Sequence, residues 1–194
     1  AQLLAAQEPG RVSRVVLVNP GPATGVPMSP AMLTLFERAI TQPDERLHLL
    51  AMGLGVQPEV PLQPGLRRLH SESGNIDDRM LSESFPAWQK AWFPEALAKV
   101  RCPVLVLAGS HDPVVKTYVV VDEVVTPIRN ARLQVLPSAG HNLSSEQPGA
   151  VSAAIERFRR APAAVDSTRH GRRSAQDARR VAGSHLPEGV ATGA

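Results

Sequence analysis

Three short apolar runs, each bounded by turn-forming residues, constrain the fold of this chain more than any other feature. They read RVVLVNP at residues 14–20, PVLVLAG at 103–109 and RLQVLP at 132–137. The first two are continuous and rich in β-branched or leucine side chains, a pattern typical of strands buried on both faces of a parallel sheet. The sequence therefore predicts three strands of one parallel sheet.

Helical patterns fill the long interval between the first two runs. Apolar positions recur at helical spacing over residues 31–40 and 45–54, and again over 78–93, where Pro86 interrupts the pattern. Residues 56–65 are a proline-broken connection. No strand is predicted in this interval, which indicates a helical insertion between two strands.

Helices are also predicted at the start of the chain and after the second and third runs. Residues 1–8 read as the end of a helix, and residues 114–128 as helical or mixed because their valines weaken the helix prediction. A last helix is predicted to have Ser144 or Ser145 as its N-cap and Pro148 in its first turn. Its apolar face holds Val151, Ile155 and Phe158. This alternation predicts an α/β fold with a parallel sheet.

The composition is that of a globular chain with a buried core. Of 194 residues, 43% are hydrophobic and 20% are charged, and the longest apolar runs are too short to cross a bilayer. The single Cys102 excludes a disulfide framework, and no cysteine and histidine residues have metal-ligand spacing. With no signal peptide recognised, we expect a cytoplasmic protein. The short apolar runs predict no membrane partner, the missing ligand spacing predicts no metal, and no cofactor is implied.

The net charge of +3 is concentrated toward the end of the sequence. Residues 161–194 carry five arginines against three acidic residues and show no apolar periodicity, so they are predicted to be disordered. No basic stripe with interleaved aromatic side chains occurs, and we therefore expect no specific nucleic-acid partner. Nucleic-acid binding through the arginine-rich tail is the alternative, and it predicts steeply salt-dependent binding.

Two loops that follow predicted strands carry the side chains best suited to chemistry. GSHDP follows the second strand and offers His111 and Asp112, and SAGHN follows the third strand and offers His141. Ligands of open α/β sheets bind at the carboxyl ends of the strands. A carboxylate there would fix the tautomer of the imidazole and stabilise its protonated form. The alternatives are an Asp-Pro turn for Asp112 and a loop histidine satisfied by its neighbours for His141. His111 is less favoured, because its neighbour already supplies the acid.

These motifs resemble the C-terminal part of the α/β-hydrolase family. PVLVLAGSHDP resembles the family's seventh strand and acid loop, and RLQVLPSAGHNLSSEQP resembles its eighth strand, catalytic histidine loop and final-helix start. RVVLVNP is similar to the sixth strand, and AQLLAAQEP to the helix that leaves the nucleophile. The resemblance spans residues 1–160. It implies that Asp112 is the catalytic acid and His141 the catalytic base.

The resemblance also implies a division of the chain. Residues 1–27 and 96–160 would form the C-terminal part of the hydrolase core, and residues 28–95 a helical cap or lid. Residues 161–194 would be the tail. Three bulky side chains are expected to anchor the cap to the core and are candidates for the substrate pocket: Trp88, Trp92 and Phe93.

The activity implied by the resemblance is hydrolysis of an ester or related acyl bond in a small molecule. A serine activated by His141 would form a covalent intermediate that water hydrolyses. The family's G-x-S-x-G elbow does not occur in this sequence, so the nucleophile is expected upstream of Ala1, and the chain alone is expected to be inactive. The same acid and base would serve an aspartate nucleophile of an epoxide hydrolase or dehalogenase. A truncated, non-catalytic fragment is the remaining alternative.

Overall fold

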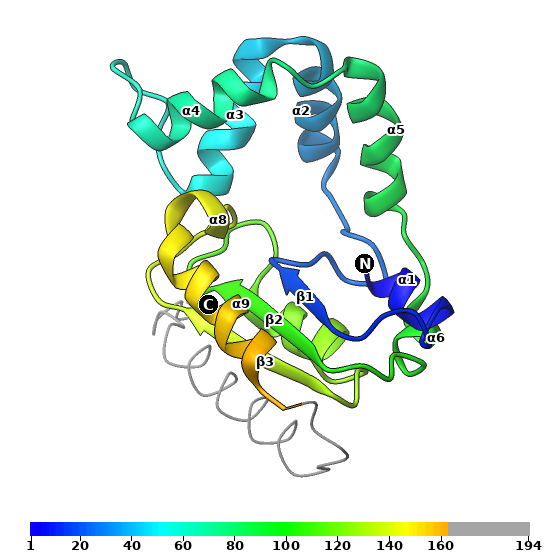
Figure 1. Ribbon diagram of the computed structural model, residues 1–194. Coiled ribbons are helices and arrows are strands. Elements are labelled where there is room, and N and C mark those ends of the chain that lie inside the picture. The colour runs from blue at the N-terminus through cyan, green and yellow to red at the C-terminus, as the bar shows by residue number, and fades with distance from the viewer. Residues whose placement is uncertain (163–194) are drawn as a thin grey trace, which may run out of the picture.

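A computed structural model describes residues 1–162, so all but the first two residues of the predicted tail, 161–194, lie outside the described residues. Figure 1 shows a sheet with helices on both faces and, apart from these, a group formed by α2 to α5. In chain order the elements are α1 (Gln2–Gln7), β1 (Val15–Val18), α2 (Pro30–Thr41), α3 (Pro43–Leu54), α4 (Pro64–Ser73), α5 (Asp78–Gln89), α6 (Pro94–Leu97), β2 (Val104–Gly109), α7 (Thr117–Val120), the π-helix η1 (Val121–Val125), β3 (Ala131–Leu136), α8 (Leu143–Glu146) and α9 (Pro148–Arg160).

The three strands form one parallel sheet in the order β1-β2-β3. In its register Val15 lies beside Val104, and Val104 lies beside Ala131. The strands occupy the three predicted runs, except that β3 begins one residue earlier, and the α/β fold class is confirmed. Because neighbouring strands are parallel, the loops that follow β2 and β3 leave from the same edge of the sheet.

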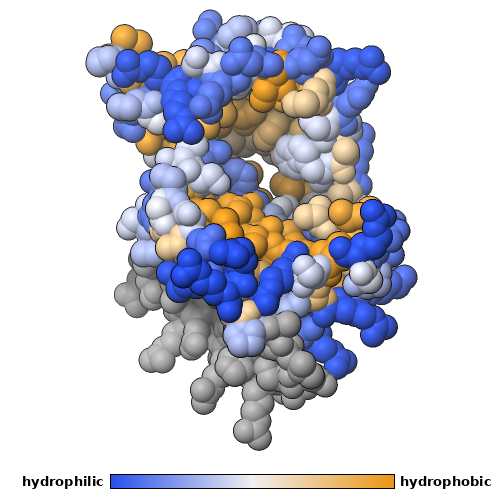
Figure 2. Space-filling model, viewed as in Figure 1, coloured by the Kyte–Doolittle hydropathy of each residue, from blue (hydrophilic) through white to orange (hydrophobic). Residues whose placement is uncertain are grey.

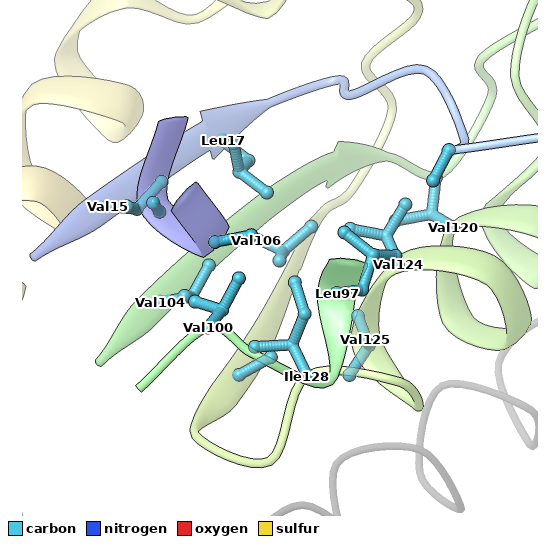
Figure 3. Packing of buried hydrophobic residues seen from close by; sticks show 14 of the residues in the cluster. Val15, Leu17, Leu97, Val100, Val104, Val106, Val120, Val124, Val125 and Ile128 are labelled. Carbon is cyan, nitrogen blue, oxygen red and sulfur yellow. The ribbon is translucent and has the colours of Figure 1, made fainter. Parts of the chain in front are cut away.

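The side chains of β2 alternate between two cores, one on each face of the sheet. Val104 and Val106 belong to a core shared with α1, α6, α7 and η1 (Figure 3), whereas Leu105 and Leu107 belong to a core shared with α8 and α9. All of β2 is buried. Burial on both faces explains why this run reads as continuously apolar. The predicted apolar face of the last helix packs on the second core through Val151, Ile155 and Phe158.

The helical excursion from α2 to α5 leaves the sheet layer and returns to it at one place. The carbonyl oxygen of Ala23 accepts a hydrogen bond of 2.8 Å from Phe93 N, and Val26 N donates one of 3.1 Å to the carbonyl oxygen of Gln89. Gly25 lies between these bonds with φ of 76°, and a Cβ there would collide with the Gln89 carbonyl oxygen. We call the two paired segments, residues 23–26 and 89–93, the stem.

Two helices within the excursion differ from the sequence prediction. The helix α4 was not predicted, because Leu66 is its one buried apolar side chain and a single anchor produces no visible periodicity. The helix α5 continues through Pro86 and ends at Gln89, short of the predicted residue 93. The Pro86 carbonyl oxygen still accepts a hydrogen bond of 3.0 Å from Lys90 N, so the helix passes this proline.

The last helix also begins differently from its prediction. Its N-cap is Gln147, without a side-chain cap, and Pro148 is its first residue. Ser144 and Ser145 lie instead in the one-turn helix α8. That turn is separate because Gln147, the residue before Pro148, leaves the helical region with φ of −136° and ψ of 57°. Within residues 1–162, no helix is long and apolar enough to span a membrane.

Candidate active site

The carboxyl edge of the sheet brings Asp112 and His141 together. His141 Nδ1 donates a hydrogen bond of 2.8 Å to Asp112 Oδ2. The Asp112 side chain is 1% exposed and the His141 side chain is 30% exposed. The bond to Nδ1 leaves Nε2 as the basic nitrogen of the neutral ring. Chemically, a ring oriented in this way can accept a proton at Nε2 while the carboxylate stabilises the resulting charge.

The second oxygen of the Asp112 carboxylate is held by its own loop. Oδ1 accepts hydrogen bonds of 2.7 Å from Val114 N and 3.0 Å from Val115 N. Asp112 therefore organises a turn and binds His141 at the same time. The turn predicted from the Asp-Pro pair thus orients Oδ2 toward the imidazole ring of His141.

The loop after β3 approaches the end of β2 closely because Gly109 has no side chain. A Cβ at Gly109 would collide with the carbonyl oxygens of Ala139 and Gly140. With glycine there, His111 N donates a hydrogen bond of 2.9 Å to the Ala139 carbonyl oxygen. The absent side chain allows the two loops to meet, and their meeting places His141 next to Asp112.

Three residues that the sequence reasoning missed hold the backbone of the His141 loop. Glu146 accepts hydrogen bonds of 2.6 Å from Gly140 N and 2.9 Å from Asn142 N. The carbonyl oxygen of Gly53, in α3, accepts one of 2.9 Å from His141 N. Asn19 reaches the loop from the end of β1: its Nδ2 donates to the carbonyl oxygens of Gly140 and His141, and its Oδ1 accepts a bond of 3.2 Å from Gly109 N.

The other histidine of the two loops makes a different contact. His111 is exposed, and its Nδ1 lies 2.8 Å from Ser110 Oγ. Ser110 Oγ in turn accepts a hydrogen bond of 2.9 Å from Ser138 N. His111 thus joins a network that links the two loops at the surface, while His141 binds the buried carboxylate.

A cavity of about 270 Å³, which we call the outer cavity, opens beside His141. It lies between the strand ends and the helices of the excursion, and Figure 2 shows apolar side chains along the opening between these two parts. Most of its wall is apolar. The lining residues are Asn19, Gly21, Val26, Phe36, Leu49, Leu50, Met52, Gly53, Trp88, Val114, Val115, His141 and Asn142.

The three aromatic side chains singled out from the sequence occupy different places. Trp88 lines the outer cavity together with His141. Phe93 is partly buried against the core that contains α1 and α6. Trp92 is 72% exposed and does not line the outer cavity. The structure thus brings only Trp88 of the three to His141.

Cys102, the single cysteine, lies just before β2 and away from this cavity. It is buried, and burial raises the pKa of its thiol. Such a thiol is a poor nucleophile at neutral pH, and Cys102 packs as part of the core that contains α1 and α6.

Comparison with known proteins identifies the family. A model of the alpha/beta hydrolase family matches residues 1–154. The chain belongs to the alpha/beta hydrolase family. Among curated proteins, none gives a significant match.

Solved structures of alpha/beta hydrolases and related enzymes share this fold. A hydrolase from Pseudomonas aeruginosa PA01 is 27% identical with a TM-score of 0.67, and the match covers 82% of this chain and 60% of that protein. The enol-lactonase from Burkholderia xenovorans LB400 is 20% identical with a TM-score of 0.68, covering 81% and 60%. A carboxylesterase from Bacillus subtilis is 21% identical with a TM-score of 0.61, covering 80% and 54%. The chain thus spans little more than half the length of these proteins.

Within the described part of this alpha/beta hydrolase chain, the site contains few groups that could take part in a reaction. Among residues 1–162, no hydroxyl or thiol group hydrogen bonds to the His141 ring. The same residues contain no group of three or more His, Cys, Asp or Glu side chains that could hold a metal ion. What the site offers is one imidazole, one buried carboxylate and an apolar cavity.

Proposed function

We propose that Asp112 and His141 are the acid and base of a Ser-His-Asp hydrolase that cleaves an ester or related acyl bond of a small molecule. The observation that carries the proposal is the 2.8 Å hydrogen bond from His141 Nδ1 to the buried Asp112 Oδ2, beside an apolar cavity. The nucleophile, in this proposal, is a serine supplied by a segment that lies upstream of Ala1 in the full enzyme.

The proposed mechanism uses His141 twice. Its Nε2 accepts the proton of the nucleophile as that group attacks the acyl carbon, and then delivers the proton to the leaving alcohol. A covalent acyl intermediate results. In the second half, Nε2 removes a proton from the water that attacks the acyl carbon, and returns it to the serine oxygen as the bond to the acyl group breaks and the acid product leaves. Asp112 keeps Nδ1 protonated throughout and stabilises the imidazolium in both halves.

The helices α2 to α5 have a defined part in this proposal. We assign residues 28–95 as a cap that covers the site, with residues 1–27 and 96–160 as part of the core. Support comes from the stem, which closes the excursion at its base, and from the outer cavity, whose wall combines Phe36, Leu50 and Trp88 of the excursion with His141 of the core. A cavity with this lining suits an apolar substrate group. The proposed enzyme is cytoplasmic, as expected from the sequence.

A fusion protein tests the roles of the two residues. The part of the Pseudomonas aeruginosa hydrolase that this chain does not cover is placed ahead of Ala1, and turnover of p-nitrophenyl butyrate is measured. Asp112→Asn is expected to lower kcat by about 10⁴, because the ring is then held in the wrong tautomer. His141→Ala is expected to abolish turnover. His111→Ala, which removes the neighbouring histidine, is the matched control and is expected to retain turnover.

The outcomes distinguish the alternatives. A folded fusion protein whose turnover survives His141→Ala contradicts the proposal. The 194-residue chain alone is expected to be inactive; turnover by that chain that His141→Ala abolishes would show that it holds its own nucleophile. An aspartate at the apex of the elbow in the longer sequence would replace ester hydrolysis by epoxide opening or halide displacement.

A further inference from the structure

A second cavity, which we call the inner chamber, lies within the helical excursion. Its volume is about 200 Å³. An apolar cavity of about 150 Å³ already binds benzene in another protein, so the inner chamber has room for a substantial apolar group. Its lining comes from α2, α3, the last residue of α4, the turn that follows it, and α5: Phe36, Ala39, Ile40, Arg46, Leu49, Leu50, Ser73, Ile76, Leu81, Ser84, Phe85 and Trp88.

The inner chamber and the outer cavity share a wall. Four residues line both: Phe36, Leu49, Leu50 and Trp88. Two of the four are aromatic, and they pack with Phe85 as a trio. The Phe36 ring stacks on Phe85 with centroids 4.9 Å apart, and Trp88 meets Phe36 edge to face at 5.5 Å. The two cavities are therefore neighbours, and Phe36 and Trp88 of this aromatic trio stand in the wall that they share.

The polar groups at the inner chamber are already satisfied within the protein. The Arg46 guanidinium donates to the carbonyl oxygens of Ala39, Ile40 and Ser73 and pairs with Asp78. The hydroxyls of two serines, Ser73 and Ser84, each donate to a backbone carbonyl of their own helix. Within residues 1–162, the one buried side-chain oxygen or nitrogen without a partner is Gln2 Oε1, which is not part of the chamber lining. The chamber thus offers contact area to a ligand and no free polar partner.

We propose that the inner chamber binds the distal end of a straight apolar chain whose reactive end lies beside His141. The inference rests on the proposed function and names the substrate class: esters whose acyl or alkyl chain is too long for the outer cavity alone. Such a chain is flexible enough to pass Phe36 and Trp88 and needs no hydrogen-bond partner at its far end. Each methylene that enters the chamber is expected to tighten binding about fourfold.

Binding can be measured without hydrolysis, because Trp88 stands between the two cavities. The chain has two tryptophans, so Trp92→Phe leaves Trp88 as the sole tryptophan fluorophore in the full 194-residue chain. Straight-chain carboxylates of four to ten carbons with a terminal bromine, which quenches tryptophan fluorescence, are titrated below their micellar concentrations. The dissociation constant is expected to fall about fourfold per methylene along the series, with quenching of Trp88.

A chamber-filling variant and a matched control locate the bound chain. Ala39 lines the chamber and is 4% exposed, whereas Ala31, on the same helix, is exposed. Ala39→Leu is expected to raise the dissociation constant of the ten-carbon probe at least about tenfold. The dissociation constant of the four-carbon probe is expected to stay unchanged. Ala31→Leu is expected to bind all probes like the parent. If Ala39→Leu fails to fold by circular dichroism, Ser84→Leu, which fills the chamber from an exposed position, replaces it with the same expected result.

Two results would overturn the inference: affinity that does not depend on chain length, or a filling variant that shows the same chain-length profile as Ala31→Leu. The assay is independent of the proposed function. Chain-length-dependent binding without ester hydrolysis in the fusion protein contradicts the proposed function and leaves the chamber assignment in place. Hydrolysis that depends on His141 but not on chain length contradicts the chamber assignment alone.

Discussion

The carbonyl oxygen of Gly53 accepts a hydrogen bond of 2.9 Å from the backbone amide of His141. One partner belongs to α3, in the helical excursion, and the other to the loop that follows β3. The contact is close, because a Cβ on Gly53 would lie 2.9 Å from Asn142 Nδ2. The position of the loop histidine is thus linked directly to the C-terminal turn of α3.

This link predicts that loosening the end of α3 exposes the His141 amide. Gly55 caps α3 in the left-handed conformation with φ of 66°, and no atom would contact a Cβ there. Gly55→Ala therefore costs only conformational strain, about 1 kcal/mol. We expect hydrogen exchange of the His141 amide to accelerate about fivefold, measured by NMR. Gly10→Ala, at a glycine with equally open surroundings, is the control. An unchanged exchange rate in Gly55→Ala would contradict the link.

Replacing Asn19 is expected to destabilise the protein more than replacing another asparagine that binds backbone. Asn19→Ala removes the side chain that joins Gly109 to the carbonyl oxygens of Gly140 and His141. Leaving these backbone groups without partners costs about 1–3 kcal/mol. Asn130→Ala removes a single exposed bond to the Arg101 carbonyl oxygen and should cost about 0.5–1.5 kcal/mol. Urea denaturation measures both, and equal losses would show that Asn19 does not organise the loop.

Glu146 should tolerate no amide in place of its carboxylate. Both of its oxygens accept backbone N–H bonds, from Gly140 and Asn142, and Glu146→Gln places an NH₂ group against one of these donors. The expected loss in the free energy of unfolding is about 1–3 kcal/mol. Glu156→Gln, which affects only exposed ion pairs on α9, should cost about 0–1 kcal/mol. A loss from Glu146→Gln no larger than that from Glu156→Gln would contradict this role.

Gly109 is expected to be more sensitive to a methyl group than Gly149. Gly109→Ala forces its Cβ against the backbone of Ala139 and Gly140, and overpacking of this kind costs about 1–3 kcal/mol. Gly149 lies in α9, where a Cβ would meet only open space, so Gly149→Ala should be neutral or stabilising by up to about 1 kcal/mol. Thermal unfolding followed by circular dichroism measures both. If Gly109→Ala unfolds at the same temperature as the parent, the loops after β2 and β3 do not need to approach each other at Gly109.

The thiol of Cys102 is expected to resist alkylation. Burial raises its pKa, so at any pH below that pKa the thiolate fraction is smaller than for a free cysteine. At pH 8 we expect iodoacetamide to react at least about tenfold more slowly with the native chain than with the chain in urea. The difference in alkylation rate between the native and the unfolded chain should narrow as the pH rises through the raised pKa. Equal rates at pH 8 would show that the end of the loop before β2 opens readily.

The strands and the two loop residues could be predicted because their signals are local. A run such as Val104–Gly109 has to be apolar throughout when both faces of the strand are buried. Asp112 and His141 each follow such a run directly, so the parallel arrangement of the strands suffices to bring their loops to one edge. No long-range contact needed to be known in advance.

The residues that hold the His141 loop escaped prediction because their partners are distant in the sequence. Asn19 reads as an ordinary turn residue before a proline, and only its bonds across more than a hundred residues reveal its part. Glu146 reads as a surface acid of a helix start. Leu66 of α4 gave no signal for another reason: it is the one buried apolar side chain of its helix, and one buried side chain leaves no period to recognise.

The stem has a consequence for how an enzyme of this architecture can change over time. Its two segments are fastened to each other by backbone hydrogen bonds, so the excursion leaves and rejoins the rest of the chain at one place. In the proposed enzyme the walls that choose the substrate and the groups that perform the reaction are therefore encoded in separable stretches of the gene. Exchanging the helices between the two segments would redirect the enzyme to new substrates without rebuilding its chemistry, provided that the new helices keep a carbonyl oxygen where Gly53 meets the His141 amide.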